Sequence, residues 1–196
     1  MQKVKRIMSE IRKFFLNRRS VRASKMLSNP IDKNDLNTII IAGLRVPDHG
    51  ALRPWKLKVI QGAALKKIDE EVILSEFIKN KPDSQKSVQD IESKRLQRAG
   101  AVIVVISTPV NHPKIPFWEM QLSSGAVCMN LLSCAQSMGY AAQWLTEWYA
   151  YNDKMLNYLG GVVDRDKVSG FIYIGHKLEE TNERKRPNLS DIVTFL

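Results

Sequence analysis

Residues 101–107 read AVIVVIS, an unbroken run of apolar, mostly β-branched side chains that ends in a serine. A half-exposed strand alternates apolar and polar residues, whereas this run is apolar on both of its faces. We therefore predict a central strand of a β-sheet that is buried on both faces. The run is far too short to cross a bilayer.

Further strands and helices are expected on either side of this run. Alternation of Trp55, Leu57 and Val59 predicts a strand that Gly62 closes, and residues 141–148 and 168–176 predict two more. Periodicity and capping signals predict helices over residues 4–15, 32–46, 63–79, 87–99, 116–138 and 152–160. The last twelve residues are expected to be extended. This mixture of helices and strands indicates an α+β fold.

Two of these helices differ in their polar faces. Residues 4–15 carry apolar side chains at positions 4, 7, 8, 11, 14 and 15, so the segment 1–16 is predicted to be an amphipathic helix that packs on protein; a membrane surface is the alternative. Residues 116–138 have almost no charged face and are predicted to be the buried core helix. Cys128 and Cys134 lie within it and are interpreted as small buried hydrophobic residues.

Length and composition limit the class of protein. The chain has 196 residues, which fits a single domain over 1–196, and its 44% hydrophobic and 26% charged residues are typical of soluble globular proteins. No signal-peptide pattern occurs, so a cytoplasmic location is expected. The three histidines are scattered without metal-ligand spacing, so no protein-held metal is predicted.

The net charge of +10 fits nucleic acid, anionic lipid or a phosphorylated small molecule. The basic residues recur in short clusters at 12–25, 45–58, 94–98 and 184–186 and do not form one stripe. This distribution favours several loops that converge on a phosphate over a nucleic-acid groove. No glycine-rich phosphate-binding motif occurs, so side chains must hold any phosphate.

Two short stretches concentrate the candidate binding residues. In NRRSVR, the side chains of Arg18, Arg19, Ser20 and Arg22 offer several donors to one phosphate; a solvated basic turn is the alternative. In RVPDHGALRPW, residues 45–55, Arg45 and His49 lie four residues apart on a turn that a proline stiffens. Alone, this histidine fits a structural role as well as a ligand-binding one.

Five blocks in a fixed order together resemble the FMN-dependent nitroreductase-like family, and its short bacterial branch of NAD(P)H nitroreductases in particular. The blocks cover the chain from about residue 16 to the end. They are NRRSVR, RVPDHGALRPW with its following strand, Trp118-Glu119 at the start of a small-residue helix, AAQWLT, and VSGFIYIGH.

The resemblance implies an α+β fold with a central mixed β-sheet flanked by helices. It also implies an intertwined homodimer with FMN at the subunit interface, and a C-terminal extension, residues 184–196, that reaches toward the partner subunit. In such enzymes NAD(P)H reduces the flavin, which then passes electrons to a nitroaromatic, quinone or similar electron-poor acceptor in a ping-pong cycle. Neither nucleic acid nor membrane is an expected partner.

The resemblance also assigns residues to FMN. Phosphate and ribityl contacts are assigned to Arg18, Arg19, Ser20 and Arg22, with a further basic contact from Arg186 and its neighbour Arg184. Contacts with the flavin ring are assigned to Arg45 and His49, the latter from the partner subunit, and to Trp144, Leu145 and Thr146. No protein acid-base residue is required, so Glu119 and Glu147 are interpreted as structural. Residues 134–139 match the region where relatives place a nicotinamide nucleotide.

Departures from the family pattern leave open alternatives. Leu145 and Thr146 replace a more polar pair, and Arg53 stands where relatives often have glutamine. A flavin-binding or flavin-sequestering protein with little turnover is therefore the alternative function. A basic nucleic-acid-binding module is a third hypothesis that rests on net charge alone.

Overall fold

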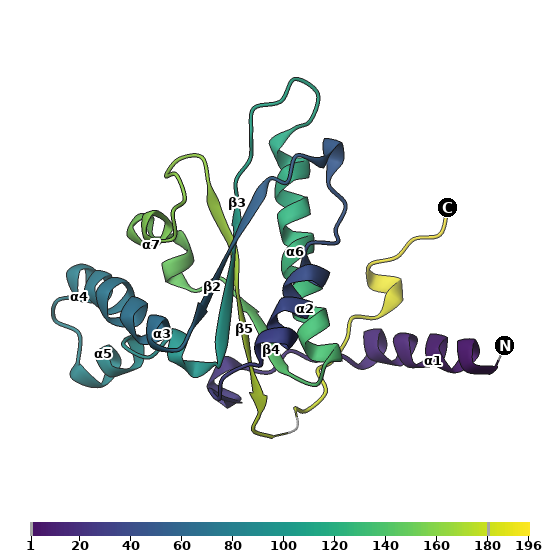
Figure 1. Cartoon of the computed structure of the whole chain (residues 1–196), viewed down its shortest axis with the longest axis horizontal. Coiled ribbons are helices and arrows are strands. Elements are labelled where there is room, and N and C mark those ends of the chain that lie inside the picture. Colours follow the sequence, from purple (N-terminus) through teal and green to yellow (C-terminus); the bar gives the residue numbers. More distant parts are fainter. Residues whose placement is uncertain (1, 180) are drawn as a thin grey trace.

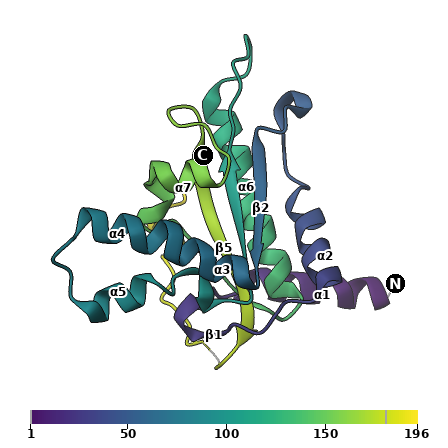
Figure 2. The same ribbon diagram turned by 60° about the vertical axis from the view of Figure 1, so that its left-hand side comes forward.

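The computed structural model describes residues 2–179 and 181–196. Seven α-helices and five strands occur among these residues (Figures 1 and 2). The helices are α1 (Gln2–Asn17), α2 (Lys33–Gly43), α3 (Ala63–Ile68), α4 (Ser75–Asn80), α5 (Lys86–Glu92), α6 (Phe117–Ser137) and α7 (Asp153–Tyr158). The strands are β1 (Met26–Leu27), β2 (Trp55–Gln61), β3 (Ala101–Ser107), β4 (Ala141–Leu145) and β5 (Lys167–Lys177).

The run AVIVVIS forms the central strand β3, and all seven of its residues are buried. It pairs with β2 on one side and with β5 on the other, in the order β1-β5-β3-β2, and β4 also pairs with β5. The prediction of a strand buried on both faces is confirmed.

The prediction of a mixed sheet is wrong for the described strands, because all four of the strand pairs are antiparallel. Long helical connections, such as the one between β2 and β3, fit either strand direction. The order of elements along the chain therefore does not determine whether a pair is parallel.

Two hydrophobic cores lie on opposite faces of the sheet. Even-numbered residues of β3, such as Val102 and Val104, pack in one core with α3, α7 and the turn at Trp148–Tyr151. Odd-numbered residues, such as Ile103, pack in the other core with α2 and α6. This split follows from the two-residue period of a strand and explains why both faces of β3 are apolar.

Most predicted helices are present with shifted ends. The side chain of Asp32 caps α2 by accepting hydrogen bonds from the backbone N–H groups of Asn34 and Asp35. The expected helix 63–79 contains a π-helical segment, Asp69–Leu74, and the expected helix 87–99 ends at Glu92 and is followed by a short 3-10 turn. Strand β1 was not predicted, because two residues give no periodic signal.

The helix at the N-terminus extends away from the sheet, and the C-terminal segment projects on the same side of the molecule (Figure 1). The apolar side chains of Ile11, Phe15 and Leu16 on α1 are exposed. The predicted apolar positions Val4, Ile7 and Met8 lie outside the described side chains. No helix in the part of the chain that the structure describes is long and apolar enough to span a membrane. Single-domain organisation over 1–196 stays a prediction.

Candidate functional site

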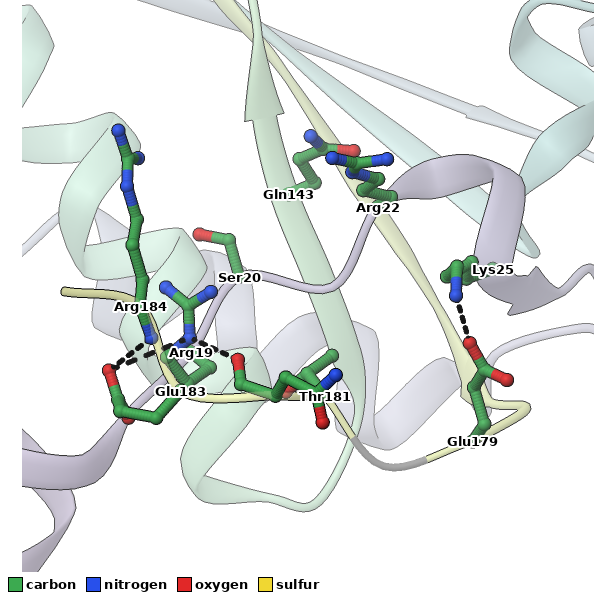
Figure 3. A pocket seen from close by; sticks show the side chains of 10 residues that line it. Arg19, Ser20, Arg22, Lys25, Gln143, Glu179, Thr181, Glu183 and Arg184 are labelled. Atoms are coloured by element: carbon green, nitrogen blue, oxygen red, sulfur yellow. Dashed lines mark hydrogen bonds and ion pairs between the residues drawn. The ribbon is translucent and has the colours of Figure 1, made fainter.

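A cavity of about 1090 Å³ lies where the NRRSVR segment, strand β4 and the C-terminal segment meet (Figure 3). Its lining is polar and contains four basic side chains, of Arg19, Arg22, Lys25 and Arg184. Ser20 and Gln143 contribute neutral polar groups to the same surface. The spacing within NRRSVR could not show this arrangement, because Arg184 comes from the other end of the chain.

Two hydrogen bonds explain why the NRRSVR segment lies beside β4. The backbone N–H of Val21 donates to the carbonyl oxygen of Ala142, at 3.2 Å, and the N–H of Ala23 donates to the side-chain oxygen of Gln143, at 2.6 Å. Val21 and Ala23 are buried, so alternate residues of the segment are anchored. Their neighbours, Ser20 and Arg22, are left facing the cavity.

The basic groups of the cavity differ in how far they are neutralised. Lys25 forms an ion pair with Glu179, and Arg19 lies 3.9 Å from a carboxylate oxygen of Glu183. The guanidinium groups of Arg22 and Arg184 have no hydrogen bond or ion pair with any residue that the structure describes. Unpaired guanidinium donors that line one cavity suit an anion with several oxygens.

Arg18 lies on the other side of the segment, in a second cavity of about 340 Å³. Its Nε donates to the side-chain oxygen of Gln136, at 3.0 Å, and the amide nitrogen of Gln136 donates to the carbonyl oxygens of Arg19 and Ala142. Burial, followed by the charges of Arg186 and Arg19, lowers the pKa of Arg18. Gln136 thus connects the NRRSVR segment to the end of α6 by hydrogen bonds. The guanidinium groups of Arg19 and Arg186 lie near that of Arg18.

Of the predicted C-terminal pair, Arg184 lines the large cavity, whereas the guanidinium of Arg186 binds the carboxylate of Glu183 at 2.9 Å. In Figure 3, Arg184 and Glu183 lie on the side of the cavity opposite Arg22 and Gln143. The structure therefore places Arg184 on the cavity surface and leaves Arg186 in an exposed local pair.

Strand β4 leads from the cavity to the predicted ring-binding residues. The indole of Trp144 lies beside β5, where its Nε1 donates to the carbonyl oxygen of Ser169 at 2.9 Å. A Cβ on Gly170 would lie 2.0 Å from that nitrogen, so this position of the indole requires glycine at residue 170. Thr146 is exposed just beyond the strand, whereas Leu145 packs against the core.

The turn after β4 is fixed by a chain of alternating charges. The carboxylate of Glu147 binds Arg95 and Arg98, each at 2.9 Å, and Arg95 also binds the buried carboxylate of Glu92. Trp148 Nε1 donates a hydrogen bond to Glu92 at 3.0 Å. These contacts support the interpretation of Glu147 as structural.

His49 lies at the other end of α6, whereas Arg45 lies beside the middle of this helix. The ring nitrogen Nδ1 of His49 is 2.7 Å from the Oε2 atom of Glu119, in the first turn of that helix. Arg45 is exposed, and its carbonyl oxygen accepts a hydrogen bond from the amide of Asn130. Glu119 and Gln136 are separated by roughly 25 Å along the helix, at about 1.5 Å per residue. Within one chain, His49 and the basic cavity are therefore apart.

The loop that carries His49 is strained and firmly held. Gly50, Ala51 and Arg53 have φ angles of 69°, 52° and 50°, a region that costs non-glycine residues free energy. The carboxylate of Asp48 accepts a hydrogen bond from the N–H of Arg53, at 2.8 Å. The Ser123 hydroxyl donates to the carbonyl oxygen of Pro47 and accepts from Trp55 Nε1.

The structure thus brings together Arg19, Ser20 and Arg22 from the predicted set and separates them from His49, while Arg45 lies outside the lining of both cavities. The residues that line the two cavities without having been predicted include Lys25, Gln136, Gln143, Thr181 and Glu183. No sequence signal distinguishes these residues, because polar and charged side chains are common on any surface. Residues 134–139 offer Gln136 to the smaller cavity.

Comparisons with known proteins agree with this architecture. A family model described as "Nitroreductase family" matches residues 16–176. A protein of Escherichia coli (strain K12) named "Putative NAD(P)H nitroreductase YdjA" is 26% identical over 185 residues, which cover 92% of this chain and 96% of that protein.

Solved structures also share the fold. A nitroreductase-like family protein from Bacillus cereus has a TM-score of 0.80 at 19% identity, with 95% of each chain covered. A nitroreductase with bound FMN from Bacteroides fragilis NCTC 9343 has a TM-score of 0.69 at 21% identity, covering 95% of this chain and 98% of that one. The nitroreductase-like fold of the chain is therefore established.

Proposed function

Because the chain belongs to the nitroreductase family, we propose that it is an FMN-dependent oxidoreductase that uses NAD(P)H to reduce electron-poor acceptors such as nitroaromatics or quinones. The observation that carries the proposal is the basic cavity beside β4, with the unpaired guanidinium groups of Arg22 and Arg184. The name of the Escherichia coli relative and the FMN in the Bacteroides fragilis structure point to the same cofactors.

The residues of the cavity fit a flavin phosphate. Arg19, Arg22 and Arg184 would hold the phosphate, and Ser20 and Gln143 would donate hydrogen bonds to it or to the ribityl hydroxyls. The charges of Arg186 and Arg19 lower the pKa of Arg18, and the carboxylate of Glu183 offsets part of this repulsion by binding Arg186. A bound phosphate would offset more of it. Arg18 and Arg186 would act on the phosphate mainly through their charge.

The far end of β4 would carry the flavin ring. From Ala142 to Thr146 an extended strand spans roughly 13 Å, so a ligand anchored at the arginines extends along β4 to Trp144 and Thr146. When bound, FMN accepts hydride from NAD(P)H and transfers electrons to the acceptor. The chain would supply a fixed turn at Leu145–Thr146, held by the ion pairs of Glu147.

We also propose that the site is completed in a homodimer, in which Arg45 and His49 of one copy contact the flavin held by the other. Large apolar side chains are exposed on α1, on the first turns of α6 and along the C-terminal segment. They include Ile11, Phe15, Leu16, Phe117, Trp118, Leu122, Leu189, Ile192 and Phe195. A second copy of the chain would cover them. The cytoplasmic location stays a prediction.

Absorbance spectroscopy of the purified protein tests the proposal. We expect flavin absorbance that bleaches anaerobically on addition of NADH or NADPH and returns when nitrofurazone or menadione is added. Arg22→Gln should lower FMN affinity about tenfold or more, because a charged hydrogen bond contributes about 1.5–3 kcal/mol. Lys86→Gln, in an exposed pair with Asp90 on α5, is the matched control and should leave affinity unchanged.

Two results would contradict this function. A colourless protein that takes up no added FMN would exclude flavin binding. A yellow protein that oxidises NAD(P)H no faster than free FMN does would support the flavin-sequestering alternative.

A further inference from the structure

We infer that Glu119 is a positioning residue, which fixes the imidazole of His49 with its proton on Nδ1 and so presents Nε2 to the flavin ring. The inference rests on the proposed function for the identity of the ligand. The contact that motivates it is the distance of 2.7 Å between His49 Nδ1 and Glu119 Oε2.

The chemistry of this pair determines the tautomer. An ionised carboxylate has no hydrogen to donate, so at neutral pH the nitrogen that contacts it must carry the proton. In a neutral imidazole the other nitrogen, Nε2, is then a bare hydrogen-bond acceptor. Without the carboxylate, both tautomers of His49 are available and a ligand has to select one.

Stability does not explain why this pair is present. The side chains are 61% and 44% exposed, and exposed ion pairs contribute little to the free energy of folding. The loop that brings His49 to Glu119 contains two non-glycine residues, Ala51 and Arg53, with left-handed backbone. Each such residue costs folding free energy, and strain of this kind often persists where a function requires the geometry.

The surroundings hold the pair in one geometry. Ser123, one turn after Glu119 on α6, binds the loop through the carbonyl oxygen of Pro47 at 2.8 Å, and Asp48 ties the loop to the N–H of Arg53 at 2.8 Å. The loop and the first turns of α6 therefore form one unit. Rotation of the His49 ring away from this position would break its hydrogen bond to Glu119.

The tautomer can be measured directly on the full-length protein without FMN. Two-bond ¹H–¹⁵N NMR of the histidine rings over a pH series, with His49 assigned by its absence in His49→Ala, should show that the neutral ring carries its proton on Nδ1 and has a bare Nε2. In Glu119→Ala the His49 signals should move toward the Nε2-protonated form. A wild-type His49 that is mainly protonated on Nε2, or one that Glu119→Ala leaves unchanged, overturns the inference.

FMN titration supplies the second readout. We expect Glu119→Ala to weaken FMN binding about three- to tenfold, and Glu119→Gln to weaken it less because the amide oxygen still accepts a hydrogen bond. In a His49→Ala background Glu119→Ala should have no further effect, since residues that act as a unit are not additive. An equal loss in both backgrounds would show that Glu119 does not act through His49.

A surface control keeps the result specific. Glu70→Ala removes another exposed carboxylate, which lies 3.7 Å from Lys66 and is remote from the loop, and it should leave both the tautomer and FMN affinity unchanged. If the wild-type protein binds no FMN, the proposed function fails and with it the assignment of Nε2 to flavin. The NMR measurement then still decides whether Glu119 fixes the tautomer.

Discussion

The two ends of helix α6 are built in opposite ways. At the C-terminal end, the segment 18–25 contains no non-glycine residue with positive φ, and the guanidinium of Arg22 has no partner among the described residues. At the N-terminal end, the His49 ring is paired with Glu119, and Ala51 and Arg53 have left-handed backbone. One end has a relaxed backbone with unpaired charge, and the other has paired side chains on a strained backbone.

This difference indicates two kinds of binding. Unpaired guanidinium groups attract an anion over some distance and tolerate small changes in its position. A histidine with one fixed tautomer contributes a single directed hydrogen bond and needs an accurately placed ring. The first end suits a phosphate, and the second suits the edge of a planar ring. The two ends lie far apart in one chain, so in the proposed dimer the second copy supplies the His49 end of each site.

Mixing two variants gives the largest effect expected and tests whether the two ends act across subunits. Arg22→Glu and the double variant Arg45→Ala/His49→Ala should each lower FMN affinity, the first by about 100-fold, because it loses a charged hydrogen bond and adds repulsion. Co-expression with two affinity tags yields a heterodimer. If the ends act across subunits, one of its sites is intact and the other has both defects.

The number of tight FMN sites then distinguishes the arrangements. One tight site per heterodimer and none per variant homodimer is the expected result of a fluorescence titration. If both ends served the site of their own chain, each site of the heterodimer would keep one defect and no tight site would appear. A wild-type chain that elutes as a monomer would contradict the dimer itself.

The turn after β4 is held by the buried carboxylate of Glu92, so the stability of the protein should depend on pH. Burial alone would raise the pKa of Glu92, but hydrogen bonds from Arg95 and Trp148 outweigh it and hold the pKa below its ordinary range. A depressed carboxyl pKa stabilises the fold above the unfolded value of about 4.3, and this stabilisation is lost as the pH falls through the folded pKa. Stability should therefore decrease below about pH 4.

Urea denaturation of wild type and Glu92→Gln over the same pH range measures this contribution. Near pH 7 the substitution should cost about 1–3 kcal/mol, the range for hydrogen bonds to a charged group and for an unsatisfied buried partner. The difference between the two proteins should shrink toward pH 3. Glu70→Gln serves as the exposed control, and a constant difference across the range would show that the charge of Glu92 is unimportant.

Much of the fold could be predicted from local patterns. The run 101–107 is almost wholly apolar because β3 is buried on both faces. The prediction of a buried core helix holds for the face of α6 with Val127 and Leu131, whereas Phe117, Trp118 and Leu122 in its first turns are exposed. Strand direction and β1 could not be predicted. Pairing of β1 with β5 depends on contacts between Met26 and Lys177, which are far apart in the sequence.

The site was predictable as residue types more than as geometry. Arg19, Ser20 and Arg22 were found because they are neighbours in a motif, and the structure places all three on one cavity. Gln143 and Arg184 come from two other segments of the same cavity; Arg184 was assigned through the family resemblance, whereas Gln143 is placed there only by the folded chain. The pairing of His49 with Glu119 likewise joins residues 70 positions apart. Neither the contact between His49 Nδ1 and Glu119 Oε2 nor the positive φ of Arg53 could be predicted from the sequence.

The smallest expected effect concerns the strain that distinguishes the two ends. Arg53 is exposed, has a φ of 50°, and its guanidinium binds no residue that the structure describes. Glycine adopts this conformation without strain, although it also gains freedom in the unfolded state. Arg53→Gly should therefore stabilise the protein by about 0.5–1 kcal/mol in chemical denaturation.

Arg53→Ala separates backbone strain from the role of the guanidinium, because it removes the charge and keeps Cβ. If strain decides, alanine gives no stabilisation and glycine does. Both variants should retain the FMN affinity of wild type, since the N–H that Asp48 accepts from is present in each. A matching loss of FMN or NAD(P)H affinity in both would instead assign the guanidinium of Arg53 to a ligand. Equal stabilisation by both would mean that charge repulsion, and not the left-handed backbone, is what makes this end of the molecule costly to fold.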